Sequence, residues 1–271
     1  MPHAPRARIH PTAIVSPEAE LADDVEVGAQ AVLEGKVQIG PGCVIRPAAY
    51  LFGPLTLGEE NLVCTGAVLG EKPQHLRYHG ETTSLEIGDG NIFREHVTVH
   101  RGTTASMKTV IGNRNFFMVN SHIGHDCVIG NNCILANGAL VAGHCTLEDN
   151  AYMSGNSAIH QFVRIGRLAL LSGCSASTKD IPPFIMQQDI DNVVNINLVG
   201  MRRAGMSNEE IQAVRRSFRF LFRDRMTLPA ALARMETELG RFAAVQEMVD
   251  FLRKCPKGIN PMRSRARDEA A

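Results

Sequence analysis

IGNRNF FMVNSH IGHDCV IGNNCI LANGAL VAGHCT, residues 111–146, is a run of six hexads that each open with a large apolar residue. A helix requires a hydrophobic period of 3.6 residues and a half-buried strand a period of 2, so a strict period of six indicates a short strand plus a turn as the repeating unit. The same frame starts at Ile9 and ends in the hexad that opens at Leu171, and all 25 leading positions are large and apolar. The repeat therefore dominates the chain.

The fifth position of each hexad is mostly small, as a narrow interior requires. Four of the seven cysteines occupy it, namely Cys43, Cys127, Cys133 and Cys145, and we interpret them as packing residues. Hexads of this form resemble the left-handed parallel β-helix, in which three hexads make one triangular coil of 18 residues. The handedness follows from that resemblance, since the repeat alone does not determine it.

The composition excludes several classes of protein. The formal net charge is zero, which disfavours wholesale binding of nucleic acid. No apolar run reaches the roughly 18 residues of a transmembrane helix, and the N-terminal MPHAPRARIHPTAIV lacks the apolar region of a secretory signal. The cysteines form no CxxC pairs, which argues against a disulfide framework or a zinc ribbon. We expect a soluble, cytoplasmic protein.

Two segments interrupt the hexads, and a different pattern follows them. The interruptions are residues 75–86 and 105–110, and on a regular prism such excursions are the places to look for function. The period fades at Pro182-Pro183, after which a capping box at Ser207 and Glu210 opens a helical pattern. We expect a β-helical domain over residues 1–182 and a helical domain over 183–271.

Polar residues gather where neighbouring coils stack. Positions 18 apart lie above one another, about 4.8 Å away. In one such column His125, Gly143 and Gln161 stack, and in the next column Asp126 and His144 do. His160 lies at the edge of these two columns. An imidazole can take a proton from a hydroxyl near neutral pH, and a carboxylate can hold its ring. The pattern indicates general-base catalysis by His125, with an N–H group of Gly124 or Gly143 receiving an oxyanion.

Two other interpretations stay open. Adjacent strand residues point opposite ways, so Asp126 can support His125 only if a turn brings both side chains round. Without such a turn, the histidines are merely solvated corner residues. Alternatively, His122, His125 and His144 could supply nitrogen ligands to zinc, as in a zinc-dependent hydratase. We favour a site without a metal, because no further ligand with evident geometry is present.

The motifs closely resemble one family. HIGHDCVIGNNCILANGALVAGH, IHQFVRIG, GCSAS and DIPPF, with GEKPQHLRYHGE and VTVHRGT upstream, are similar to the UDP-N-acetylglucosamine acyltransferases that open lipid A, and hence lipopolysaccharide, biosynthesis. The resemblance implies a homotrimer with its site between neighbouring β-helices and no cofactor. It implies transfer of a 3-hydroxyacyl chain from acyl carrier protein to the 3-hydroxyl of a UDP-amino sugar.

The resemblance also implies roles for individual residues. His125 is the general base, Asp126 supports it and the Gly143 N–H is the oxyanion donor. Gly173 leaves room for the acyl chain. The expected substrate-binding residues are Gln74, His75, Arg77, His122, His144, His160, Gln161, Gly173, Asn197 and Arg203.

This chain departs from the family pattern near the acceptor. His75 stands where the family usually has an aspartate, which replaces an acceptor-only carboxylate by a group that can donate. The segment QQDIDNVVNINLVG is one residue shorter, and Ala204 replaces an arginine. A changed acceptor, such as a 3-amino sugar nucleotide, is therefore an alternative within the enzyme class. A non-catalytic binding trimer is an alternative outside it.

Arginines recur along the first long helix expected after Ser207. They are Arg215, Arg216, Arg219 and Arg223. The spacing fits either a solvated helix face or a docking strip for acidic acyl carrier protein. The family resemblance favours docking.

Overall fold

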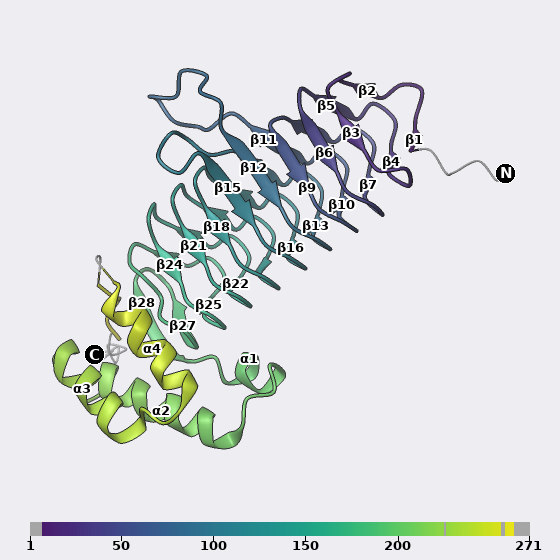
Figure 1. Cartoon of the computed structure of the whole chain (residues 1–271). Helices are drawn as coiled ribbons and strands as arrows, with labels where there is room; N and C mark the ends of the chain where they lie inside the picture. Colours follow the sequence, from purple (N-terminus) through teal and green to yellow (C-terminus); the bar gives the residue numbers. More distant parts are fainter. Residues whose placement is uncertain (1–6, 225, 256–257, 263–271) are drawn as a thin grey trace, which may run out of the picture.

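The computed structural model describes residues 7–224, 226–255 and 258–262. They form a triangular prism of three parallel sheets with helices at its C-terminal end (Figure 1). The predicted fold class, a left-handed parallel β-helix with a helical C-terminal part, is confirmed. No helix among these residues is long and apolar enough to cross a membrane.

As far as Ser177 each sheet collects every third strand, and the last two strands then both join the first sheet, where they pair antiparallel. The first sheet has 11 strands: β1 (Arg8–Ile9), β4 (Glu26–Val27), β7 (Val44–Ile45), β10 (Leu62–Val63), β13 (Ile92–Phe93), β16 (Phe116–Phe117), β19 (Ile134–Leu135), β22 (Tyr152–Met153), β25 (Leu170–Leu171), β27 (Ile185–Gln188) and β28 (Asn192–Ile196). The second has nine: β2 (Ile14–Val15), β5 (Val32–Glu34), β8 (Tyr50–Phe52), β11 (Val68–Glu71), β14 (Thr98–His100), β17 (His122–Ile123), β20 (Leu140–Val141), β23 (Ala158–Ile159) and β26 (Ala176–Ser177). The third has eight: β3 (Glu20–Leu21), β6 (Val37–Ile39), β9 (Leu55–Leu57), β12 (Ser84–Ile87), β15 (Lys108–Ile111), β18 (Val128–Ile129), β21 (Thr146–Leu147) and β24 (Arg164–Ile165).

The hexad positions divide between interior and exterior as the pattern predicts. Leading residues such as Ile123 and small fifth residues such as Ala139 are fully buried, and the four fifth-position cysteines are buried as well. The sixth residue of each hexad points outward. On the first sheet these outward residues are mainly large and apolar, from Val44 and Leu62 through Phe116 to Leu170, whereas the third sheet presents mainly polar ones.

The fourth position of most hexads is a turn residue with positive φ. Asn120, Asn132 and Asn150 adopt it, and so does Asp126 with φ of 61°. Asparagine and aspartate tolerate this left-handed conformation because their short side chains bond locally. At His125–Asp126 the same turn brings both side chains to one side of the chain.

Both excursions begin and end earlier in the chain than the expected residues 75–86 and 105–110. β12 begins at Ser84 and β15 at Lys108, because Leu85 and Thr109 turn inward and pair in the third sheet. The loops therefore span residues 72–83 and 101–107. The loops increase the number of residues between stacked positions, which is 18 in a regular coil. Asn61 and Asn91 are 30 residues apart and Asn91 and Asn115 are 24 apart, whereas Asn115 and Cys133 are again 18 apart.

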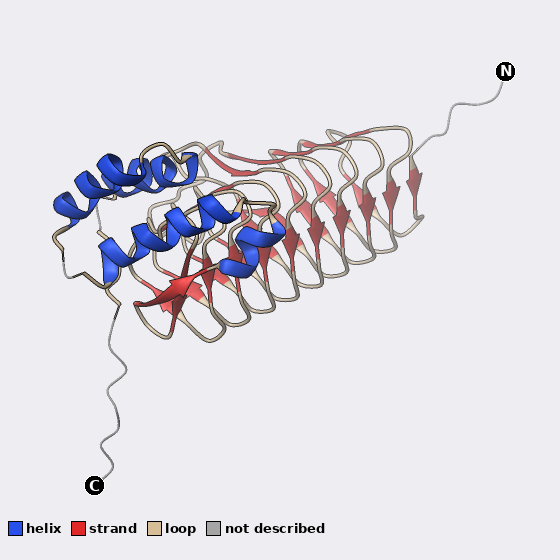
Figure 2. Cartoon of the chain, turned by 90° about the horizontal axis from the view of Figure 1, so that it is seen from below, coloured by secondary structure: helices blue, strands red, loops and turns tan. Residues whose placement is uncertain are grey.

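Helices cover the C-terminal end of the prism (Figure 2). They are α1 (Leu198–Arg203), α2 (Asn208–Phe222), α3 (Leu228–Leu239) and α4 (Ala243–Arg253). The predicted capping box opens α2. The strands β27 and β28 follow the expected domain boundary at residue 182 and continue the first sheet, so the helices begin only at Leu198. Arg164 fastens α4 to the prism, because its guanidinium lies 4.0 Å from the Phe251 ring centroid and donates to the Lys254 carbonyl at 2.7 Å.

Candidate active site

His125 and Asp126 form a buried hydrogen-bonded pair at the corner between β17 and β18. Their side chains are 6% and 0% exposed, and His125 Nδ1 lies 2.7 Å from Asp126 Oδ2. The turn that the sequence left uncertain is present, so Asp126 can orient the ring. The pair leaves His125 Nε2 as the nitrogen available to a substrate.

Hydrogen bonds keep Asp126 ionised. Burial alone raises the pKa of this carboxyl group, but hydrogen bonds from Ser106, His125 and Thr103 outweigh burial and lower the pKa to about 2. A carboxylate only accepts hydrogen bonds, so the proton between the two groups resides on His125 Nδ1. Nε2 of the neutral ring is then a free base.

Gly143 lies directly against the His125 ring, one coil further along. A Cβ at this position would lie 2.6 Å from Cε1 and 2.8 Å from Nε2 of His125. Only glycine permits this approach. Among the described residues, no atom accepts a hydrogen bond from the Gly143 N–H. This donor therefore remains open to a ligand beside the base, as an oxyanion hole requires.

Three further histidines surround His125. The ring centroid of His75, from the first excursion, lies 5.3 Å away, and that of His144 lies 4.9 Å away. His144 stacks on Phe162 with a centroid distance of 4.5 Å. His122 is held by Thr98, whose Oγ1 lies 2.8 Å from His122 Nδ1. The first excursion thus reaches the base, as its position in the repeat suggested.

His100 belongs to this cluster, and the sequence reasoning missed it. It is only 6% exposed, its ring centroid lies 5.1 Å from that of His122, and its Nδ1 accepts from the Gln74 N–H at 3.3 Å. Burial, with the charge of His122, lowers the pKa of His100 to about 4. Burial likewise lowers the pKa of His122 and of His144. His100 could have been suspected from the sequence, because it lies in the motif VTVHRGT just before the second excursion.

The other predicted substrate-binding residues lie around this cluster or on another face. Gln74, Arg77, His160 and Gln161 are exposed, the first two in the first excursion and the others on the coil after His144. Gly173 lies at a corner between the first and second sheets, where an added Cβ would meet nothing closer than the Gly155 carbonyl at 3.4 Å.

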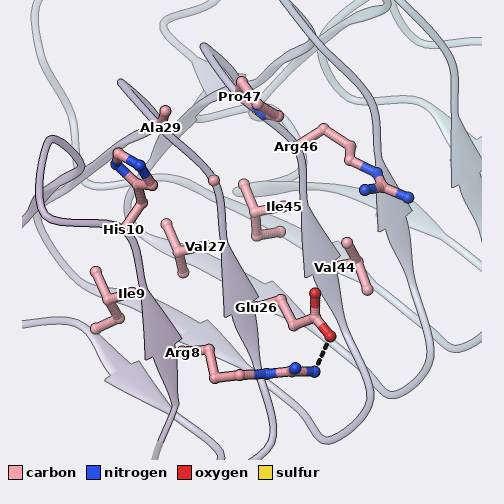
Figure 3. A pocket seen from close by; sticks show the side chains of 11 residues that line it. Arg8, Ile9, His10, Glu26, Val27, Ala29, Val44, Ile45, Arg46 and Pro47 are labelled. Carbon is pink, nitrogen blue, oxygen red and sulfur yellow. Dashed lines mark hydrogen bonds and ion pairs between the residues drawn. The ribbon is translucent and has the colours of Figure 1, made fainter.

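Asn197 and Arg203 line a separate hollow on the first sheet, with Tyr152 and Leu170 on its floor. The Asn197 side chain caps α1, accepting from the Gly200 N–H at 2.9 Å, and donates to the Leu168 carbonyl at 2.9 Å. Within one chain this hollow and the His125 corner lie on different faces. A second hollow lies on the first sheet over the opening coils. Figure 3 shows the Arg8–Glu26 ion pair at one end of it, with Arg46 and Pro47 toward the other end.

The four predicted docking arginines, three on α2 and Arg223 at its C-cap, are exposed and differ in their partners. Arg216 pairs with Glu238 at 2.5 Å and Arg219 with Asp224 at 3.0 Å. Arg215 and Arg223 form no ion pair with a described residue, although the Arg223 guanidinium lies 5.6 Å from the Phe218 ring centroid. Two of the four charges therefore have no ion-pair partner in the described part of the chain.

The residues that could bind a metal differ from the expected set of His122, His125 and His144. The groups within 4.8 Å of one another are His125, Asp126 and His144, whereas His122 is engaged by Thr98. Both Asp126 oxygens already accept hydrogen bonds, which makes this carboxylate a poor additional ligand. The arrangement suits a base and its orienting carboxylate better than zinc.

Comparisons with known proteins agree along almost the whole chain. The family model described as Udp N-acetylglucosamine O-acyltransferase, domain 2, matches residues 180–260, and that of the bacterial transferase hexapeptide (six repeats) matches residues 108–143. This chain is 42% identical to the acyl-[acyl-carrier-protein]--UDP-N-acetylglucosamine O-acyltransferase of Myxococcus xanthus and 46% identical to that of Anaeromyxobacter sp.. Each alignment covers 93% of this chain, and 99% and 98% of the relatives.

Solved structures give the same result. The UDP-N-acetylglucosamine acyltransferase of Bacteroides fragilis superposes with a TM-score of 0.89 at 35% identity, covering 93% of this chain and 99% of the other. The corresponding Acinetobacter baumannii protein has a TM-score of 0.88 at 36% identity, with coverages of 94% and 99%.

Proposed function

The chain belongs to the UDP-N-acetylglucosamine O-acyltransferase family, and on that premise we propose that it transfers a 3-hydroxyacyl chain from acyl carrier protein to the 3-hydroxyl of UDP-N-acetylglucosamine. The observation that carries the proposal is the His125–Asp126 pair with the open Gly143 N–H beside the ring. The names and coverage of the relatives support the substrates. The acyl carrier protein thioester is the only activated group that the reaction needs.

The proposed reaction is direct attack by the sugar. His125 Nε2 takes the proton of the 3-hydroxyl as its oxygen attacks the thioester carbonyl. The Gly143 N–H receives the negative charge on the carbonyl oxygen. Collapse breaks the carbon–sulfur bond, and the thiolate of the carrier takes the proton from His125. The buried Cys127 thiol donates to the Ala142 carbonyl at 3.1 Å and takes no part.

The test is turnover of His125→Ala, with His96→Ala as a matched control, because His96 is an exposed corner histidine on another edge of the prism. A positioned general base contributes roughly 10²–10⁴-fold to the rate. We expect His125→Ala to lose at least the lower figure in kcat while remaining folded. Substantial turnover by this variant would refute the mechanism.

We propose that the protein works as a homotrimer whose sites lie between subunits. The apolar outward residues of the first and second sheets, such as Ile134, Tyr152 and Leu140, suit contact with another copy. The hollow with Arg203 and the His125 corner lie on different faces of one chain, so a shared site requires a neighbour. Mixing inactive His125→Ala with inactive Arg203→Ala should restore activity through hybrid trimers. No recovery after verified subunit exchange would contradict this arrangement.

His75 favours a second candidate acceptor. Its ring centroid lies 5.3 Å from that of His125, so it borders the atom from which His125 would take a proton. An imidazole, unlike a carboxylate, can donate a hydrogen bond to a 3-amino group or to a hydroxyl. His75→Asp should change the ratio of kcat/KM between UDP-N-acetylglucosamine and its 3-amino analogue. An unchanged ratio would remove His75 from acceptor selection.

Arg215 and Arg223 are the proposed leading contacts for the acidic carrier protein, with Arg216 and Arg219 supporting them.

A further inference from the structure

The second excursion wraps around Asp126. Residues 101–107 take the place of the short corner that a regular coil would have directly before the His125–Asp126 corner. Thr103 donates twice, from its N–H to Oδ1 and from its hydroxyl to Oδ2, both at 2.8 Å. Ser106 Oγ lies 2.5 Å from Oδ1 and 2.7 Å from the Lys108 carbonyl oxygen, and the Ser106 N–H donates to Oδ1 at 3.3 Å.

The excursion also replaces a backbone hydrogen bond of the repeat. At regular corners the fourth-position N–H donates to a carbonyl of the preceding coil, as His144 does to His125 and Asn150 does to Asn131. The Asp126 N–H instead donates to the Thr109 hydroxyl at 2.9 Å. Thr109 is fully buried. Three hydroxyl residues spaced three apart thus hold the carboxylate and its backbone.

Two imidazoles face Asp126 Oδ2, and only one of them lies within hydrogen-bond distance. His125 Nδ1 is 2.7 Å away, whereas His144 Nδ1 is 3.7 Å away. Oδ1 is occupied by Thr103 and Ser106, and Oδ2 is shared between the Thr103 hydroxyl and His125 Nδ1. A carboxylate has about four lone-pair sites. With the others filled, the site that faces the His125 imidazole is reserved for it, which holds the ring in one tautomer and one orientation.

We propose that Thr103, Ser106 and Thr109 are positioning residues that act through Asp126 to keep His125 in the tautomer whose Nε2 is a free base. This proposal rests on the general-base function above. It assigns to the second excursion the task of orienting the carboxylate.

The experiment compares Thr103→Val, which keeps the shape and the backbone donor but removes the hydroxyl donor, with Ser106→Ala and their double variant. Thr104→Val is the matched control, because Thr104 is the adjacent, exposed threonine of the same loop. Thr103→Ser tests rescue by a conservative change. Nitrogen-15 NMR of histidine-labelled protein, assigned with His125→Ala, reports the tautomer, and steady-state kinetics separate kcat from KM.

We expect Thr103→Val and Ser106→Ala each to lower kcat about tenfold, a part of the general-base contribution, with KM changed less than about twofold. The His125 resonances should show a mixture of tautomers, while Thr103→Ser and Thr104→Val resemble the parent. Parent-like kcat and tautomer in folded Thr103→Val, or in Ser106→Ala if Thr103→Val does not fold, would overturn the proposal. If His125→Ala stays active while Thr103→Val still changes the tautomer, the general-base function fails and the positioning role stands.

Discussion

Lowering the pH from 7.5 to 4.5 is expected to destabilise the fold through His100. The ring is 6% exposed, accepts a hydrogen bond from the Gln74 N–H and faces His122. Burial lowers the pKa of His100 from 6.5 to about 4 in the folded chain. The unfolded chain, whose histidine keeps the ordinary pKa, therefore binds a proton first as the pH falls, and stability is lost between pH 6.5 and 4.

The magnitude follows from the two pKa values. At pH 4.5 the unfolded histidine is almost fully protonated, whereas the folded one is largely neutral. One pKa unit corresponds to about 1.4 kcal/mol, so this single group should remove about 2.5 kcal/mol of unfolding free energy between pH 7.5 and 4.5. His122 shifts in the same direction, so the contribution of His100 must be isolated by substitution.

The assay is urea unfolding of the parent and His100→Gln at several pH values and one protein concentration. Glutamine keeps an acceptor for the Gln74 N–H and does not titrate. The variant should be less stable at pH 7.5, and the difference from the parent should shrink by about 2.5 kcal/mol at pH 4.5. A constant difference across this range would show that His100 does not bind its proton with a depressed pKa.

Four other substitutions test the site, the α1 cap and the docking of the carrier protein. Gly143→Ala places a methyl group 2.6 Å from the His125 ring, so kcat should fall at least about 100-fold with little loss of stability. Gly124→Ala places its methyl group 2.8 Å from backbone atoms, so this variant should instead have a lower melting temperature. Equal effects of the two variants on kcat and on melting temperature would contradict this contrast. Asn197→Ala removes the α1 cap and a buried hydrogen bond and should cost about 1–3 kcal/mol in urea unfolding. Arg215→Glu should raise the KM for acyl carrier protein several-fold at low salt and less at high salt, and an unchanged KM would exclude docking there.

Much of the fold was predictable because the residue types at the first and fifth positions of each hexad specify which side chains are buried. An apolar first residue and a small fifth residue can both be buried only if the chain turns at each corner of a narrow prism, and Ile123 and Cys127 occupy these positions as expected. The capping box at Ser207 predicted the start of α2 for a similarly local reason. The strands β27 and β28 were missed, because their pairing with β25 and each other depends on contacts distant from the hexad pattern.

The active-site residues were also partly predictable. Stacking at intervals of 18 placed His125 beside Gly143 and Asp126 beside His144. The left-handed turn at Asp126 could have been inferred from the asparagines that fill the same hexad position, such as Asn132 and Asn150. The roles of Thr103 and Ser106 could not, because an excursion has no repeat that would fix its register.

The order of residues is enough to specify the prism, its coil spacing and the corner at which His125 and Asp126 lie, because these features repeat from hexad to hexad. Three features became visible in the folded chain: the Asp126 carboxylate faces the His125 ring, His100 and His75 join the cluster, and the second excursion supplies donors that keep the carboxylate charged. The physical reason is that a periodic pattern specifies which residues stack, whereas irregular loops reach their partners through contacts that no local pattern encodes.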